Sequence, residues 1–112
     1  MSVRNDGINV GKAIRSILDQ SYSNFEFLIL DDFSTDNTYE KINKFKDSRI
    51  TIFQNSENLG LTKSLNLLLN KSKGEYIARQ DSDDVSFKER FENQLKFIQK
   101  HNLDACTTRA VT

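Results

Sequence analysis

Residues 25–32, FEFLILDD, form an apolar run that only Glu26 interrupts before it ends in two aspartates. A run of this kind predicts a strand covered on both faces, as in a parallel sheet. The preceding segment, 9–21, favours a helix because its apolar side chains recur at helical spacing. The following segment, 34–45, begins with Ser and Thr caps and has one apolar side, so it also predicts a helix. A buried strand between two helices predicts an α/β fold.

The rest of the chain continues this alternation. Further strands are expected at 49–55, 75–80 and 104–112, and further helices at 60–74 and 86–101. Asn9 would cap the first helix, Gly74 would close the third, and Ser86 with Glu89 would form a capping box for the last. That last helix is expected to bury Phe87, Phe91, Leu95 and Ile98. We therefore predict one domain over residues 1–112, with a mostly parallel sheet flanked by helices.

The first strand of this sheet is expected to be short. Only residues 1–3, MSV, precede the first loop, so the strand is predicted to be clipped. A clipped strand leaves backbone groups unpaired at a sheet edge, and such edges recruit partner chains. The sequence therefore also predicts pairing of two copies through an exposed edge.

The composition excludes several classes of protein. Lys plus Arg and Asp plus Glu are 16 each, so no net charge directs the chain to nucleic acid or to an anionic membrane. No apolar stretch approaches the roughly 20 residues that cross a bilayer, and the start of the chain has no signal-peptide pattern. The single Cys106 fits a reducing compartment. These features favour a cytoplasmic domain and leave open the membrane association of a longer parent protein.

Acidic side chains follow two of the predicted strands. Asp31 and Asp32 end the first buried run, while Asp81, Asp83 and Asp84 follow the strand predicted at 75–80. Ligands of open α/β sheets bind at the carboxyl ends of the strands. Carboxylates there suit Mg²⁺ or Mn²⁺, and a bound cation would relieve their mutual repulsion. The alternative is a solvated loop that leads into a helix, whose N-terminus favours negative charge.

Two other classes have similar acidic patterns. A phosphoacceptor receiver module also carries an acidic pair after a strand, but on its first strand, whereas here a helix precedes FLILDD. A phosphatase of the haloacid dehalogenase type uses D-x-D-x-[TV], which DSDDV at 81–85 matches, but there the motif opens the domain. No glycine-rich phosphate loop and no His/Cys cluster for zinc occurs in the sequence.

Three motifs together resemble the N-terminal half of a family 2 glycosyltransferase with the GT-A fold. They are AIRSILDQSYSNFEFLILDDFSTDNT at 13–38, NLGLTKSLN at 58–66 and KGEYIARQDSDDVSFKERFENQ at 73–94. The resemblance covers nearly the whole chain and keeps the order of the motifs. It implies a domain that binds a nucleotide-diphosphate sugar, commonly UDP-linked.

The resemblance also implies roles for particular residues. Asp32 would accept a hydrogen bond from the uracil ring, and Ser2 and Arg4 would bracket the base. Asp83, the last acid of the D-x-D at 81–83, would hold a divalent cation, Mn²⁺ or Mg²⁺, on the diphosphate. Asp81 would lie near the ribose or a metal-bound water.

The sequence departs from the family's pattern at two of these places. Arg4 stands where the family usually has an aromatic residue, so a guanidinium plane would stack on the base. Leu65 stands where many relatives have Arg, which leaves Lys63 as the phosphate contact. The family's general base comes from a later region, so we expect these 112 residues to bind a donor without transferring its sugar. The acceptor, a saccharide or a lipid-linked glycan, and an inverting outcome are likewise implied only by the resemblance.

Overall fold

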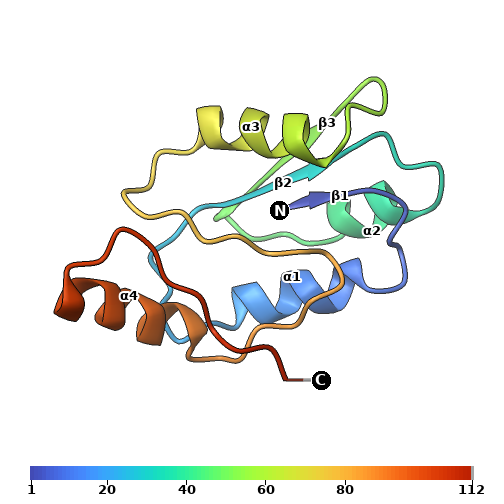
Figure 1. Ribbon diagram of the computed structural model, residues 1–112. Helices are drawn as coiled ribbons and strands as arrows, with labels where there is room; N and C mark the ends of the chain where they lie inside the picture. Colours follow the sequence, from blue (N-terminus) through green and yellow to red (C-terminus); the bar gives the residue numbers. More distant parts are fainter. Residues whose placement is uncertain (112) are drawn as a thin grey trace.

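The computed structural model describes residues 1–111 and contains a three-stranded parallel sheet in the order β1–β2–β3 (Figure 1). The strands are β1 (Ser2–Val3), β2 (Phe27–Asp31) and β3 (Ile50–Gln54). The helices are α1 (Val10–Leu18), α2 (Thr38–Asn43), α3 (Leu61–Lys71) and α4 (Arg90–His101). The predicted α/β class and parallel sheet are confirmed.

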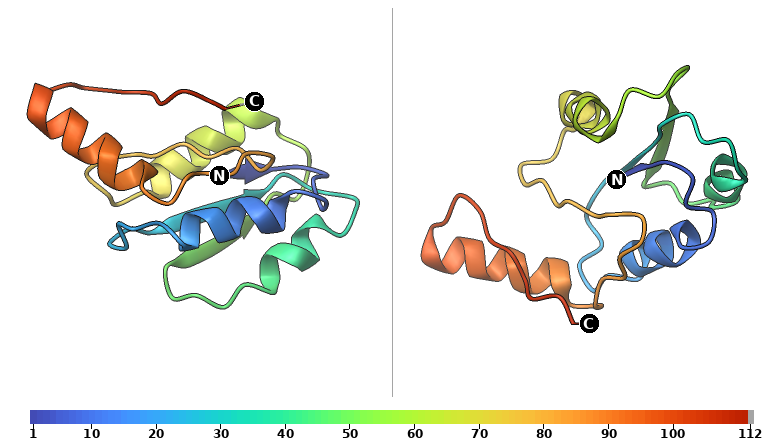
Figure 2. Two further views of the ribbon diagram at one scale, coloured as in Figure 1. Left: turned by 90° about the horizontal axis from the view of Figure 1, so that it is seen from below. Right: turned by 45° about the vertical axis from the view of Figure 1, so that its right-hand side comes forward.

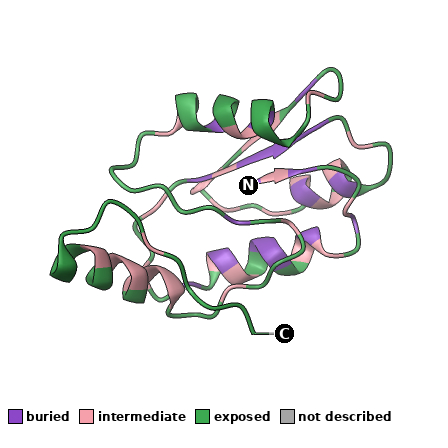
Figure 3. Cartoon of the chain, viewed as in Figure 1, coloured by how far each residue is buried: buried purple, intermediate pink, exposed green. Residues whose placement is uncertain are grey.

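The main core lies between β1, β2 and the helices α1 and α2. Alternate residues of β2, Phe27 and Ile29, point toward this face and are buried. The apolar stripe of α1 packs against them, as the buried colour of its inner side shows in Figure 3. The fully buried cluster comprises Met1, Val3, Val10, Ala13, Ile14, Ile17, Phe27, Ile29 and Ile42. Burial of these side chains is what holds α1 and α2 against the sheet.

Helix α3 covers the other face of β1 and β2, so the sheet lies between two helical layers (Figure 2). Leu68 and Ser64 are the buried side chains of this helix, and Leu30 is buried on the facing strand. Gly60 precedes the helix with a φ of 86°, a left-handed conformation that glycine adopts readily. Within residues 1–111, no helix is long and apolar enough to cross a membrane.

The strand predicted at 75–80 is not present. The residues after α3 return to β1, where Arg79 and Asp81 line the same cavity as Ser2, but they form no ladder. A strand needs a partner along its length, and β1 offers only Ser2–Val3. The prediction of a last strand was also wrong for 104–111, which carry no strand; Thr112 lies outside the described residues.

Two predicted helix boundaries were also wrong. Helix α4 begins at Arg90 rather than at Ser86, and the Ser86 hydroxyl donates to Gln80 Oε1 at 2.7 Å instead of capping it. Asn9 does occupy the predicted N-cap position of α1, but its side chain donates to Asp6 and not to the helix. Helix α3 ends at Lys71, before Gly74.

The predicted burial of α4 was wrong as well. Phe87 precedes the helix and is 69% exposed, and α4 itself contains no fully buried residue. Phe91, Leu95 and Ile98 are half-buried. Phe91 packs edge-on against Phe25, with 5.5 Å between the ring centroids. The helix therefore rests against the domain by one side of its first turns.

Candidate functional site

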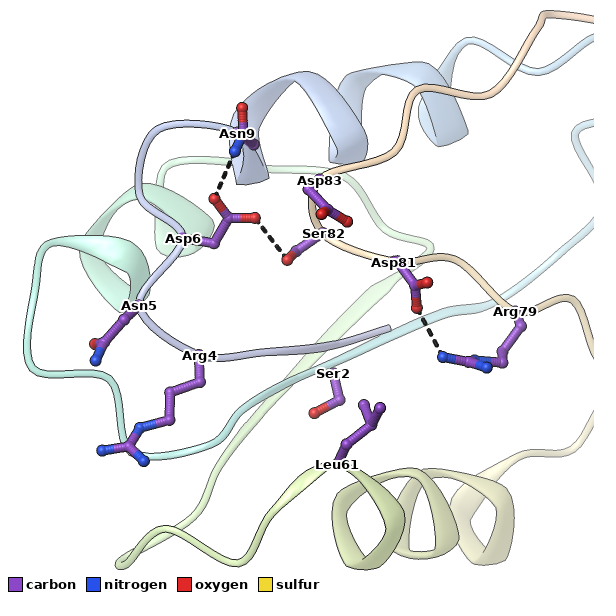
Figure 4. Close-up of a pocket in the computed structure, with 10 residues that line it drawn as sticks. All are labelled: Ser2, Arg4, Asn5, Asp6, Asn9, Leu61, Arg79, Asp81, Ser82 and Asp83. Atoms are coloured by element: carbon purple, nitrogen blue, oxygen red, sulfur yellow. Dashed lines mark hydrogen bonds and ion pairs between the residues drawn. The ribbon is translucent and has the colours of Figure 1, made fainter. Parts of the chain in front are cut away.

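The two acidic segments meet at the carboxyl end of the sheet. A cavity of about 380 Å³ lies between β1, the start of α3 and the returning segment (Figure 4). Four of the residues singled out in the sequence, Ser2, Arg4, Asp81 and Asp83, line it, and Asp6 joins them from the β1–α1 loop. The site thus brings together residues from opposite ends of the chain.

A second cavity, of about 190 Å³, adjoins the first. Asp32, Asn58 and Gly60 line it, and Ser2 and Arg4 line both cavities. Arg4 is exposed and lines both cavities. The predicted base-binding residues therefore surround one compartment, and Asp83, the predicted metal ligand, lines the next together with Asp81.

Asp32 is buried and its carboxylate is held by three donors. Oδ1 accepts from Asn55 Nδ2 at 2.9 Å and from the Leu59 amide at 2.8 Å, and Oδ2 accepts from the Gly60 amide at 2.9 Å. Burial opposes ionisation of Asp32. These donors and the charge of Arg4 outweigh it and hold the pKa of the carboxyl below its ordinary value. Asp32 is therefore an ionised acceptor, and Oδ2, with one donor, keeps room for another.

The acidic residues 81–84 form a tight turn. The Asp84 amide donates to the Asp81 carbonyl at 3.3 Å, which places Ser82 and Asp83 at the tip. Asp81 is paired with Arg79 at 2.8 Å. Within residues 1–111 the Asp83 carboxylate has neither a hydrogen bond nor an ion pair, and it is exposed toward the larger cavity. Of the turn's acids that line the cavity, Asp83 is the one free to take a ligand.

The donor set of the larger cavity suits a hard cation only if the ligand completes it. Among residues 1–111, no three His, Cys, Asp or Glu side chains are placed closely enough to hold a metal ion. Mg²⁺ is commonly bound by one or two carboxylates together with waters and substrate phosphates. The carboxylates of Asp83 and Asp81 fit that arrangement.

Some of the polar groups around the site do not match the sequence-based expectations. Lys63, predicted as a phosphate contact, is exposed on the first turn of α3 and lines neither cavity. Arg79 lines the larger cavity instead, so it is a better placed cation. Asp6 and Asn9 were not expected; they come from a loop whose polar residues carry no distinctive sequence signal. Asp31 is fully buried, and its Oδ1 has no partner within the described residues.

Comparison with known proteins identifies the family of this domain. The sequence matches the family described as "Glycosyl transferase family 2" over residues 1–112. The glycosyltransferase EpsE of Bacillus subtilis (strain 168) is 42% identical over 104 residues, which are 90% of this chain and 37% of EpsE. WfaP of Escherichia coli, a UDP-Glc:alpha-D-GlcNAc-diphosphoundecaprenol beta-1,3-glucosyltransferase, is 43% identical over 86 residues, 77% of this chain and 34% of WfaP.

Solved structures show the same architecture. Residues 1–349 of S. aureus TarS in complex with UDP superpose with a TM-score of 0.83 at 25% identity, covering 99% of this chain and 36% of that one. The mannosyltransferase PcManGT of Pyrobaculum calidifontis, in complex with GDP-Man and Mn²⁺, has a TM-score of 0.80 at 22% identity. It covers 87% of this chain and 30% of that chain, and at this identity it shows the fold alone.

The chain is an α/β domain of the glycosyltransferase GT-A type. It belongs to glycosyltransferase family 2, and it spans about a third of the length of the two curated relatives described above. The receiver-module and phosphatase alternatives receive no support from these comparisons.

Proposed function

We propose that this chain binds a nucleotide-diphosphate sugar, with UDP as the nucleotide, across the two adjoining cavities. One observation carries the proposal. Asp32 at the end of β2 and Asp83 in the acidic turn line neighbouring compartments that share Ser2 and Arg4. In this proposal Asp32 accepts a hydrogen bond from the base, and the free carboxylate of Asp83 binds the cation on the diphosphate, at the edge of the sheet where ligands of such folds bind. The UDP complex of TarS supports the choice of nucleotide.

The smaller cavity is the proposed base site. The remaining acceptor position on Asp32 Oδ2 suits the ring N–H of uracil, and the planar guanidinium of Arg4 suits stacking on a base. Ser2 adds a hydroxyl at the junction of the two cavities. The low pKa of Asp32 keeps this acceptor charged at neutral pH.

The larger cavity is the proposed diphosphate site. Asp83, with Asp81 beside it, would hold Mn²⁺ or Mg²⁺, and Arg79 and Arg4 bring positive charge to the same cavity. Such a cation stabilises negative charge on a departing nucleoside diphosphate. The residues of this chain orient the donor by its base and by its diphosphate, so that the sugar is presented at the mouth of the larger cavity.

The transfer step itself is proposed for a longer protein. An acceptor hydroxyl would attack the anomeric carbon with inversion while a general base, which we do not assign to any residue of this chain, removes its proton. We therefore propose that residues 1–112 form the donor-binding half and transfer no sugar by themselves. A lipid-linked saccharide is the proposed class of acceptor, because WfaP is named for a diphosphoundecaprenol-linked substrate. For such an acceptor, we propose that the longer protein acts at the intracellular side of the membrane.

Calorimetric titration with UDP, with and without Mn²⁺, tests the proposed site. We expect Mn²⁺ to tighten UDP binding, and Asp83→Ala to abolish that tightening. Asp84→Ala is the matched control, since Asp84 belongs to the same turn but lines neither cavity. Absence of UDP binding by the wild-type chain contradicts the nucleotide site. Metal-dependent binding that survives in Asp83→Ala contradicts the role of the acidic turn.

The pairing of two copies through an exposed sheet edge stays a separate prediction. Sedimentation velocity at increasing concentration tests it, and a monomer throughout the range would contradict it.

A further inference from the structure

A buried glutamine, Gln80, holds both ends of the acidic turn. It is 6% exposed, and its Nε2 donates to the Asp81 carbonyl at 3.1 Å and to the Asp84 carbonyl at 2.8 Å. The turn's own backbone hydrogen bond is long, at 3.3 Å. The side chain of Gln80 therefore supplies the stronger of the contacts that close the turn.

The other half of the same amide is bound to the start of α4. Gln80 Oε1 accepts from Ser86 Oγ at 2.7 Å and from Arg90 Nη1 at 2.9 Å. A primary amide has two N–H donors and two acceptor positions, and all four are filled here. Because each contact requires oxygen on one side and nitrogen on the other, the amide has a single orientation.

Arg90 extends this arrangement to the residue before the glutamine. Its Nη2 donates to the Arg79 carbonyl at 2.7 Å, and its Nη1 also donates to Ser86 Oγ at 3.0 Å. The Ser86 amide in turn donates to Ser16 Oγ on α1 at 3.1 Å. The residues on both sides of the acidic turn are thus anchored to two helices through side chains.

We infer that Gln80 is a positioning residue for the proposed metal–diphosphate site. It lines neither cavity, so its effect would pass through the backbone of the turn that carries Asp83. This inference rests on the proposed function and adds a residue that the acidic motif alone does not reveal. In the sequence Gln80 is one of several consecutive polar residues, between Arg79 and DSDD, and it becomes distinctive only through its burial and its four contacts.

Gln80→Glu is the variant that isolates this role. Glutamate has the same shape and keeps the acceptors for Ser86 and Arg90, but it loses both donors to the turn and faces the two carbonyls with a negative charge. We expect the affinity for UDP in the presence of Mn²⁺ to fall by about 10- to 100-fold, as when a group that orients a metal ligand is changed. The affinity for UDP in a chelator-treated, metal-free buffer should be unchanged, because the base compartment is intact. Loss of both affinities in parallel would indicate a merely structural role and overturn the inference.

Two further variants make the result decisive. Gln94→Glu is the same chemical change on a side chain that also contacts Arg90, at 3.1 Å, but does not contact the turn. It should leave Mn²⁺-dependent binding within about twofold, as surface substitutions usually do. Arg90→Lys keeps the charge and loses the forked contact to Gln80 and Arg79, so it should weaken Mn²⁺-dependent binding by about threefold. If Gln80→Glu does not fold, Arg90→Lys provides the test instead. Unchanged Mn²⁺-dependent UDP binding by Arg90→Lys then overturns the inference.

Titration of the wild-type chain distinguishes a failure of the proposed function from a failure of the positioning role of Gln80. Metal-dependent UDP binding by the wild-type chain, together with equal binding by Gln80→Glu, overturns the positioning role and leaves the proposed function standing. No metal-dependent UDP binding by the wild-type chain removes the proposed function, and the positioning role falls with it.

Discussion

The Ser82 hydroxyl donates a hydrogen bond of 2.7 Å to Oδ2 of Asp6, a residue 76 positions away in the sequence. The other oxygen of Asp6 accepts from Asn9 Nδ2 at 2.8 Å, so the carboxylate is fixed against the start of α1 (Figure 4). The acidic turn and the β1–α1 loop are therefore joined at the wall of the larger cavity. This contact and the Gln80 amide hold the turn from opposite sides.

Loss of this contact should weaken ligand binding more than it weakens the fold. Ser82→Ala removes the donor at the tip of the turn, and we expect the affinity for UDP with Mn²⁺ to fall by about 0.5–1.5 kcal/mol, the net value of one hydrogen bond. Calorimetry measures the change. Ser72→Ala, which removes a hydroxyl bonded to the Leu69 carbonyl at the end of α3, is the control and should bind normally. Equal losses in both variants would contradict the prediction.

Removal of a side chain that donates to Asp32 should lower the stability of the domain. Asn55 is buried and donates to Asp32 Oδ1 at 2.9 Å and to Ser64 Oγ at 3.1 Å. We expect Asn55→Ala to lower the free energy of unfolding by about 1–3 kcal/mol, because it leaves buried acceptors with fewer donors. Urea denaturation measures this. Asn66→Ala, at an exposed position of α3, should change stability by less than about 0.5 kcal/mol.

Acid should destabilise the domain in a defined range. Arg49 donates to Asp47 from its side chain and its backbone amide and lowers the pKa of that carboxyl from 3.8 to about 2. A carboxyl whose pKa is lower in the folded state stabilises the fold above its unfolded pKa. This contribution should be fully present above pH 3.8 and lost as the pH falls toward 2, and the low pKa of Asp32 acts in the same direction.

The corresponding measurement compares unfolding free energies at several pH values. Asp47→Asn should be less stable than wild type near pH 6, and the difference should shrink as the pH falls through 2, because Asp47 becomes neutral in the folded state only below that pH. A constant difference between the two proteins across this range would show that the effect is not ionisation of Asp47.

A further prediction concerns the hydrophobic core, where Ile14 of α1 is fully buried against the sheet. Ile14→Ala should lower the free energy of unfolding by about 2–5 kcal/mol, because it removes buried methyl groups and leaves a cavity. Ile8 precedes the same helix and is 88% exposed, so Ile8→Ala should be nearly neutral. Chemical denaturation of both variants measures the contrast, and similar values would contradict the assignment of the core.

The elements that were predicted correctly have local causes. The apolar run of β2 and the stripe of α1 follow from periodicity within a few residues, and their positions agree with the structure. The segment 75–80 has a strand-like composition, but pairing depends on a neighbour, and β1 is two residues long. The capping box at Ser86 failed because the Ser86 hydroxyl donates instead to Gln80, six residues earlier, on the far side of the acidic turn.

The same distinction applies to the site. The position of Asp32, directly after β2, follows from the rule that ligands bind at the carboxyl ends of parallel strands, and Asp32 lines the smaller cavity. Asp83 lines the larger cavity although the segment before it forms no strand. Asp6 was not predicted, because its contact with Ser82 joins segments far apart in the sequence. Gln80 was not predicted either, because its contacts with the acidic turn and with Arg90 depend on the folded path of the chain between residues 80 and 90. Lys63 was chosen from a motif position, and the orientation of α3 places it outside both cavities.

The unpaired return segment has a consequence for amide hydrogen exchange. Within residues 1–111, no backbone amide of 75–80 donates to another backbone carbonyl, and Tyr76 and Ile77 are exposed. These amides should exchange with solvent by small local openings that leave the sheet intact, whereas those of β2 should exchange only through much larger unfolding. The proposed donor site thus joins a slowly exchanging part of the fold, which carries Asp32, to a rapidly exchanging part, which carries Asp83. A ligand that bridges the two parts would slow exchange selectively in the second and register there as a gain of protection.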